Sequence, residues 1–141
     1  ELIVVPGITA ACSGAAVLGA PLNHDFCVIS LSDLLTPWDK IEKRLRAAAM
    51  GDFAIAVYNP SSHKRKDYLK RACEILLETM EENRACGYVE NIGREGTKAV
   101  VCTLKELRDT QVNMFTTVCS ALPPWHTGGL HPPPQGNFLF Q

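Results

Sequence analysis

Short apolar runs without polar alternation are the feature that most constrains the fold of this 141-residue chain. The clearest are LIVV at 2–5 and DFAIAVY at 52–58, both rich in β-branched residues or alanine. A strand with apolar side chains on both faces must be covered on both faces, as in a sheet that lies between helices. The runs therefore predict a buried sheet, and the chain is long enough for one domain of this kind.

Apolar runs recur along the chain and predict four further strands, at 26–31, 85–89, 98–104 and 114–118. Segments with helical pattern separate the strands and are expected at 10–18, 37–50, 64–83 and 105–108. Thr9 and Thr36 are suited to cap the first two helices, and Pro37 fits the first helical position. Gly19 and Gly51 end these helices. The alternation predicts an α/β fold, an αβα sandwich with a mixed sheet.

The segment at 64–83 is expected to form the longest helix. Its predicted buried stripe comprises Leu69, Ala72, Cys73, Leu76 and Met80. The basic cluster Lys64–Lys66 stands at its start, and it is either a solvated face or a partner for ligand carboxylates. The segment 120–141 is rich in Pro and Gly without a period, which indicates a disordered or loosely attached tail with solvated histidines.

Composition narrows the class of partner. The net charge of −1 gives no reason to expect a nucleic acid or an anionic membrane as partner. No apolar stretch has transmembrane length, and no basic segment typical of a signal peptide precedes the first apolar run. The six cysteines are scattered without metal-ligand spacing, so no metal is expected, and Cys27, Cys73 and Cys102 fit core positions. These features predict a cytoplasmic protein with reduced thiols.

Three polar or Gly-rich turns follow predicted strands, at 6–9, 58–61 and 91–96. If the strands before them run parallel, all three turns share one edge of the sheet, where ligands of α/β proteins bind. Thr9 and the amides of Ala10 and Ala11 would then point at a ligand. The alternative for the first turn is an ordinary crossover whose small residues allow a close contact between helix and sheet.

The strings VVPGITAACSGAAVLGAPLNHDF, CVISLSDLLTPWDKIEKRL, AVYNPSS, ENIGREG and MFTTV together resemble the tetrapyrrole methylases, enzymes of corrin and sirohaem synthesis. The SLSDLLTPW and YNP…GREG strings are most similar to the branch of precorrin-3B C(17)-methyltransferases in cobalamin synthesis. The resemblance covers about residues 2–118.

The resemblance implies two α/β domains with S-adenosyl-L-methionine bound between them. The Gly-Pro-Gly loop and Gly-Asp-Pro segment of the first domain have no counterpart in this sequence. Residues 1–8 are therefore interpreted as the last strand of that domain and a hinge, and 9–119 as the second domain. The strand at 2–5 is expected to be poorly packed. Residues 120–141 depart from the family pattern and form the aberrant tail.

The resemblance also implies site residues. In relatives, the Thr-Ala pair of the PGITA segment and the residue after the central strand's tyrosine contact the cofactor. The glycine of the ENxG turn lies near the adenosine, although Ile92 is an alternative placement for Gly93. The cofactor set is Thr9, Ala10, Tyr58, Asn59, Gly93 and Arg94.

The implied reaction is the transfer of a methyl group from a sulfonium to a ring carbon of a precorrin, coupled to ring contraction. Such a transfer needs alignment in a dry cleft and neither a metal nor a strong base. Ring contraction requires proton transfers, for which His24, Asp25 and Glu95 are candidates, each with a structural alternative. With Arg94, which could bind substrate carboxylates, they form the expected substrate set, and no catalytic residue is assigned.

Two other functions remain open. The chain could be a non-catalytic small-ligand-binding α/β module, since the first-domain motifs are missing from it. It could also be another tetrapyrrole methylase, although the SLSDLLTPW and GREG strings favour the C(17) branch. By resemblance, the complete enzyme is expected to be a homodimer that binds a small-molecule tetrapyrrole.

Overall fold

The computed structural model describes residues 2–62 and 65–121. In these residues the strands form one mixed sheet of order β1-β2-β5-β3-β4. The strands are β1 (Phe26–Ser30), β2 (Ala54–Tyr58), β3 (Ala85–Glu90), β4 (Lys98–Thr103) and β5 (Thr116–Ser120). Strand β1 is parallel to β2, while β5 is antiparallel to both of its neighbours and β4 to β3. The prediction of a mixed sheet is confirmed.

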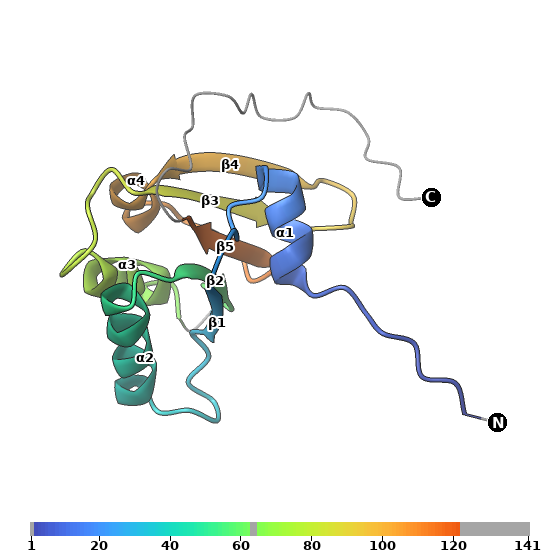
Figure 1. The fold of residues 1–141 in the computed structure, drawn as a ribbon, viewed down its shortest axis with the longest axis horizontal. Coiled ribbons are helices and arrows are strands. Elements are labelled where there is room, and N and C mark those ends of the chain that lie inside the picture. Colours follow the sequence, from blue (N-terminus) through green and yellow to red (C-terminus); the bar gives the residue numbers. More distant parts are fainter. Residues whose placement is uncertain (1, 63–64, 122–141) are drawn as a thin grey trace.

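Helices cover both faces of the sheet (Figure 1). The helices are α1 (Ala10–Leu18), α2 (Trp38–Met50), α3 (Tyr68–Leu76) and α4 (Leu104–Arg108). Side chains of β2 alternate between two apolar clusters: Ile55 and Val57 pack with α2, α3 and α4, and Ala56 packs with α1. Both faces of β2 are therefore buried, which is why its sequence is apolar throughout. The predicted αβα sandwich is confirmed.

Helix α1 consists mostly of small residues because it lies close to the sheet. A side chain at Gly14 would meet Ile92 and Thr117 at ordinary van der Waals distances of 3.4–3.7 Å. On the sheet side, a Cβ at Gly87 of β3 would come within 2.9 Å of the Leu18 side chain. A Cβ at Gly87 would push the helix outward, whereas one at Gly14 fits, so the glycine of β3 sets how closely these two layers approach.

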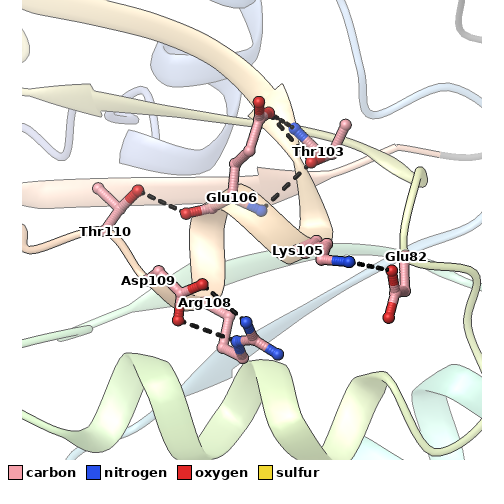
Figure 2. A network of polar contacts seen from close by, with 7 residues as sticks. All are labelled: Glu82, Thr103, Lys105, Glu106, Arg108, Asp109 and Thr110. Carbon is pink, nitrogen blue, oxygen red and sulfur yellow. Dashed lines mark hydrogen bonds and ion pairs between the residues drawn. The ribbon is translucent and has the colours of Figure 1, made fainter.

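The predicted helix at 64–83 is wrong in length. Helix α3 spans only Tyr68–Leu76 and is shorter than α2, although the whole predicted stripe from Leu69 to Met80 is buried. Turns follow Leu77, and the acidic residues beyond it pair with other elements: Glu78 with Arg46, and Glu82 with Lys105 (Figure 2). An apolar stripe continues past the helix end because the chain stays on the core after it stops being helical.

Helix boundaries show which caps are real. Pro37, not Thr36, is the N-cap residue of α2, and no side chain caps that helix. Helix α4 has a complete capping box: Thr103 accepts from the Glu106 amide, and the Glu106 carboxylate accepts from the Thr103 amide (Figure 2). Gly19 ends α1, as predicted, and the structure shows that it does so in the left-handed conformation.

The chain ends deviate from the predicted boundaries. Leu2–Val5 is not a strand: these residues are irregular and 77–91% exposed, in an arm that extends away from the sheet (Figure 1). A strand requires a hydrogen-bonding neighbour, and no strand of the described residues pairs with this arm. At the other end, the predicted start of the tail at 120 is wrong, because Ser120 belongs to β5 and both Ser120 and Ala121 are buried. The remainder of the predicted tail, 122–141, lies outside the described residues.

Strand direction places the site. Strands β2 and β3 are each antiparallel to β5, so they run in the same direction, and β1 runs with them. Their carboxyl ends therefore meet at one edge of the sheet, together with the amino end of β5. In the described part of the chain, no helix has the length and apolar character needed to cross a membrane.

Candidate functional site

An open cavity of about 240 Å³ lies at the edge where β2 and β3 end and β5 begins. The start of α1 and the turn after β3 complete its wall. Its lining residues are Ala10, Tyr58, Asn59, Ile92, Arg94, Met114, Phe115, Thr116 and Thr117. Segments from 10, 58–59 and 92–94 thus converge, as expected from the turns in the sequence. The segment at residue 10 is the start of α1, and the strand expected before it, at 2–5, is not formed.

The Tyr58 side chain joins the end of β2 to the start of α1. Its hydroxyl accepts a hydrogen bond from the Ala11 amide at 2.7 Å and is hydrogen-bonded to Thr9 Oγ1. The expectation that the Ala11 amide points at a ligand is therefore wrong, because that amide is bonded to Tyr58. Ala10 still lines the cavity, next to the exposed Thr9.

Two asparagines terminate the strands at this edge. Asn59 follows β2 with a φ of 53°, and Asn91 follows β3 with a φ of 55°. Asparagine tolerates the left-handed region better than most residues, and such residues often cluster at binding sites. Asn59 Nδ2 donates to Ser30 Oγ at 2.9 Å, while Asn91 Nδ2 donates to the Gly96 carbonyl at 3.3 Å. The ends of both strands are thus braced by side-chain hydrogen bonds.

The turn after β3 presents Arg94. Thr97 Oγ1 bonds the carbonyl oxygens of Asn91 and Arg94, and Gly93 adopts a left-handed φ of 69°. The guanidinium carbon of Arg94 lies 4.5 Å from the centroid of the Phe115 ring. A cation held over an aromatic face at the cavity wall can bind an anionic ligand group.

Other predicted site residues are placed differently. Ile92 lines the cavity, whereas Gly93 does not, so the alternative placement in the turn matches the geometry. Glu95 is exposed in the same turn but is not part of the cavity wall. His24 and Asp25 precede β1 and lie at the opposite edge of the sheet, because the site edge holds the carboxyl end of that strand. The structure does not bring these two residues to the cavity.

Four lining residues are absent from the predicted set: Met114, Phe115, Thr116 and Thr117. They belong to the start of β5 and the segment before it. The sequence did point to this segment, because MFTTV at 114–118 is one of the strings that resemble the tetrapyrrole methylases. The role of this string in the site could not be inferred from the sequence. It follows from the direction of β5, which is antiparallel to β2 and β3, so that its amino end lies beside their carboxyl ends.

One residue of the basic cluster Lys64–Lys66, Arg65, forms an ion pair within the fold. Arg65 Nε lies 2.7 Å from Asp33 Oδ1, and the Tyr68 hydroxyl donates to Asp33 Oδ2 at 2.7 Å. The hydrogen bond from Tyr68 and the charge of Arg65 lower the pKa of Asp33 below its ordinary value. The same bond and burial raise the pKa of Tyr68. Lys66 is exposed, and Lys64 lies outside the described residues.

All six cysteines are free thiols. Cys73 is buried, whereas Cys27 and Cys102 are half-buried against the same core cluster. Burial raises the pKa of Cys86 to about 12 and that of Cys102 to about 11. These thiols are therefore poor nucleophiles at neutral pH, which is consistent with a packing role.

Comparisons with known proteins identify the family of this fold and cavity. A family model for tetrapyrrole (corrin/porphyrin) methylases matches residues 1–108. The chain belongs to the tetrapyrrole methylases. The resemblance found in the sequence is thus confirmed, and with it membership of a methyltransferase family.

The relatives of this chain include proteins named as cobalt-factor III methyltransferases and as cobalamin biosynthesis proteins. The chain is 46% identical over 118 residues to the cobalt-factor III methyltransferase of Priestia megaterium, covering 84% of this chain and 22% of that protein. It is 49% identical over 108 residues to the probable cobalt-factor III C(17)-methyltransferase of Methanocaldococcus jannaschii, covering 76% and 43%. This methylase chain therefore spans less than half the length of either relative.

Solved structures of tetrapyrrole methylases share the fold. The methyltransferase CobJ superimposes with a TM-score of 0.77 at 41% identity, over 87% of this chain and 52% of that one. A uroporphyrin-III C-methyltransferase from Thermus thermophilus, complexed with S-adenosylhomocysteine, superimposes with a TM-score of 0.57 at 19% identity, over 84% and 50%. The second likeness supports the fold alone.

Proposed function

We propose that this chain forms one wall of the active site of an S-adenosylmethionine-dependent enzyme that methylates C-17 of precorrin-3B or its cobalt form, with ring contraction, in cobalamin synthesis. The observation that carries the proposal is the convergence of Ala10, Asn59 and Arg94 on one cavity. Sequence identity of 46–49% to cobalt-factor III methyltransferases supports the choice of substrate within the family.

The cavity residues fit the cofactor in chemistry. Hydroxyl groups of Thr9 and Thr116 are hydrogen-bonding groups at or beside the cavity, and Met114 and Phe115 provide apolar surface for a flat base. The cavity is open, so a second wall must complete a site that excludes water. We assign that wall to a first domain, to which residues 1–8 form the hinge. Residues 9–121 form the second domain, in which β5 ends at Ser120, one residue beyond the predicted boundary at 119.

The mechanism that follows relies on alignment. When bound, S-adenosylmethionine supplies an activated methyl group that a nucleophilic ring carbon can take without metal assistance. The hydrogen bond from the Ala11 amide to the Tyr58 hydroxyl ties the start of α1 to the end of β2, and Asn59 is held by its bond to Ser30, so the residues that line this wall are fixed for orienting the donor. Arg94 binds a substrate carboxylate at the rim. Of the three candidates for the proton transfers of ring contraction, His24 and Asp25 are set aside because they lie at the far edge of the sheet. Glu95, exposed in the turn that presents Arg94, stays a candidate, and further groups are assigned to the first domain.

The proposal extends to the oligomeric state and the partners of the complete enzyme. The complete enzyme is expected to be a homodimer with a small-molecule tetrapyrrole as partner and neither nucleic acid nor membrane. The free thiols are consistent with the reducing cytoplasm as its location.

Calorimetric titration with S-adenosylhomocysteine tests the proposal. The chain alone and a fusion carrying the first half of the Methanocaldococcus relative before residue 1 are compared. We expect measurable binding by the chain and tighter binding by the fusion. Asn59→Ala should weaken both, and Asp25→Asn, at the opposite sheet edge, should change neither. Failure of both proteins to bind would refute the proposal. Binding by the fusion without methylation of a precorrin would favour the non-catalytic ligand-binding module.

A further inference from the structure

The N-terminus of helix α1 is capped by Tyr58, a residue of strand β2. Thr9 occupies the N-cap position with the extended backbone of a cap, φ −70° and ψ 147°, but its side chain does not cap the helix. A capping threonine normally accepts from the amide two or three residues later. Here that amide, on Ala11, donates instead to the Tyr58 hydroxyl at 2.7 Å. The first turn of α1 is therefore held by β2.

The two hydroxyl groups leave one proton for a ligand. Thr9 Oγ1 and Tyr58 Oη are hydrogen-bonded, and either can be the donor. Each hydroxyl carries one proton, and their mutual bond uses one of the two. The Ala11 amide occupies an acceptor site on Tyr58 and uses neither proton. Thr9 is exposed and Tyr58 lines the cavity, so the second proton is available there.

We propose that Tyr58 is a positioning residue for the cofactor. By capping Ala11 itself, it keeps the Thr9 hydroxyl away from the helix end, and the Thr9–Tyr58 pair then donates one hydrogen bond to an acceptor oxygen of the cofactor. This inference rests on the proposed function and refines it, since it separates the role of the tyrosine hydroxyl from simple contact by the tyrosine ring.

Removal of the Tyr58 hydroxyl has a specific consequence. In Tyr58→Phe the Thr9 side chain is free to rotate and cap α1 in the usual way. The helix then keeps a cap, while the hydroxyl is withdrawn from the cavity. In Thr9→Val the Tyr58 hydroxyl still caps Ala11, but the paired hydroxyl is lost. Both variants should therefore weaken cofactor binding with little loss of stability.

A double-mutant cycle tests the pair on the 141-residue chain, with S-adenosylhomocysteine affinity measured by calorimetry. Each single variant should bind about fivefold more weakly, the equivalent of one hydrogen bond. The double variant should bind no more than twofold more weakly than either single variant. Tyr88→Phe is the matched control, because Tyr88 is buried in the cluster on the opposite face of the sheet. It should bind like the parent.

Hydrogen exchange of the Ala11 amide separates a positioning role of Tyr58 from a purely structural one, in which loss of the Tyr58 hydroxyl alone would expose this amide. Protection should persist in Tyr58→Phe, where Thr9 takes over the cap, and fall in the double variant. The inference is overturned if Tyr58→Phe binds like the parent, if the single losses multiply in the double variant, or if Ala11 loses protection in Tyr58→Phe. If the chain binds no S-adenosylhomocysteine the inference also fails, whereas binding by the fusion would still uphold the proposed function.

Discussion

The guanidinium of Arg94 lies over the ring of Phe115, with 4.5 Å between its central carbon and the ring centroid. The two residues come from the turn after β3 and the segment before β5, which lie 21 positions apart. Both line the cavity. The aromatic ring thus fixes where a positive charge stands at the rim of the proposed site.

Arg94→Ala should weaken binding of a polycarboxylate tetrapyrrole such as uroporphyrin by about fivefold, since an exposed ion pair contributes on the order of 1 kcal/mol. The loss should shrink at high salt, because exposed charges are screened. Fluorescence titration at two salt concentrations measures both effects. Arg44→Ala, which removes an exposed charge from α2, should leave affinity unchanged. Equal losses in the two variants would indicate a general charge effect.

Asn59 allows a test of the turn that ends β2. Asn59→Ala places a Cβ residue with no side-chain amide at φ 53° and should lower the free energy of unfolding by about 1 kcal/mol. Asn59→Gly accepts this backbone without strain and should cost less, although it also loses the bond to Ser30. Urea unfolding of both variants compares them. Alanine as stable as glycine would show that the left-handed turn does not constrain this position.

Gly87 and Gly14 form a matched pair across the α1–sheet interface. Gly87→Ala should destabilise the chain by about 1–3 kcal/mol, because its Cβ would lie 2.9 Å from the Leu18 side chain and 3.0 Å from the Val100 carbonyl oxygen. Gly14→Ala meets its neighbours at 3.4 Å or more and should be stabilising by up to about 1 kcal/mol, since alanine favours a helix. Thermal unfolding measures the difference. The reverse order would mean that α1 can move outward freely.

The Asp33 carboxylate should make stability depend on acid pH. Its pKa is lower in the folded state than in the unfolded chain, because it accepts from Tyr68 and lies beside Arg65. The group therefore stabilises the fold above its ordinary value of 3.8, and this contribution is lost as pH falls below that value. Asp33→Asn should flatten the fall in melting temperature between about pH 4 and pH 2. An unchanged slope would place the acid sensitivity elsewhere, for example at Glu42 or Glu78, whose pKa values are also lowered.

The half-buried thiol of Cys102 should make the stability of the fold depend on alkaline pH. The pKa of Cys102 rises from 9.0 to about 11 on folding, because burial disfavours the thiolate. A raised pKa means that stability is full below pH 9 and is lost as pH rises toward 11. Cys102→Ser should reduce the loss of melting temperature over this interval. The exposed Cys12→Ser serves as control and should leave the slope as it is in the parent.

Local pattern predicted the layers well and the element ends poorly. Apolar runs located the strands of the sheet, and small residues located α1, because burial acts on each side chain where it stands. The apolar stripe from Leu69 to Met80 suggested one long helix, since burial continues where the helix does not. At Leu2–Val5 the same apolar signal appeared without a neighbouring strand, and the segment is irregular.

The sequence by itself determined the fold class, the covered sheet and, through its motifs, the family. The tertiary structure decided which of the candidate residues meet. Insertion of β5 between β2 and β3 brought Phe115 to Arg94, and strand direction sent His24 to the opposite edge. It also gave the cap of α1 to Tyr58 in place of Thr9. Such pairings join residues far apart in the chain, and their geometry depends on strand order and direction, which local propensity does not encode.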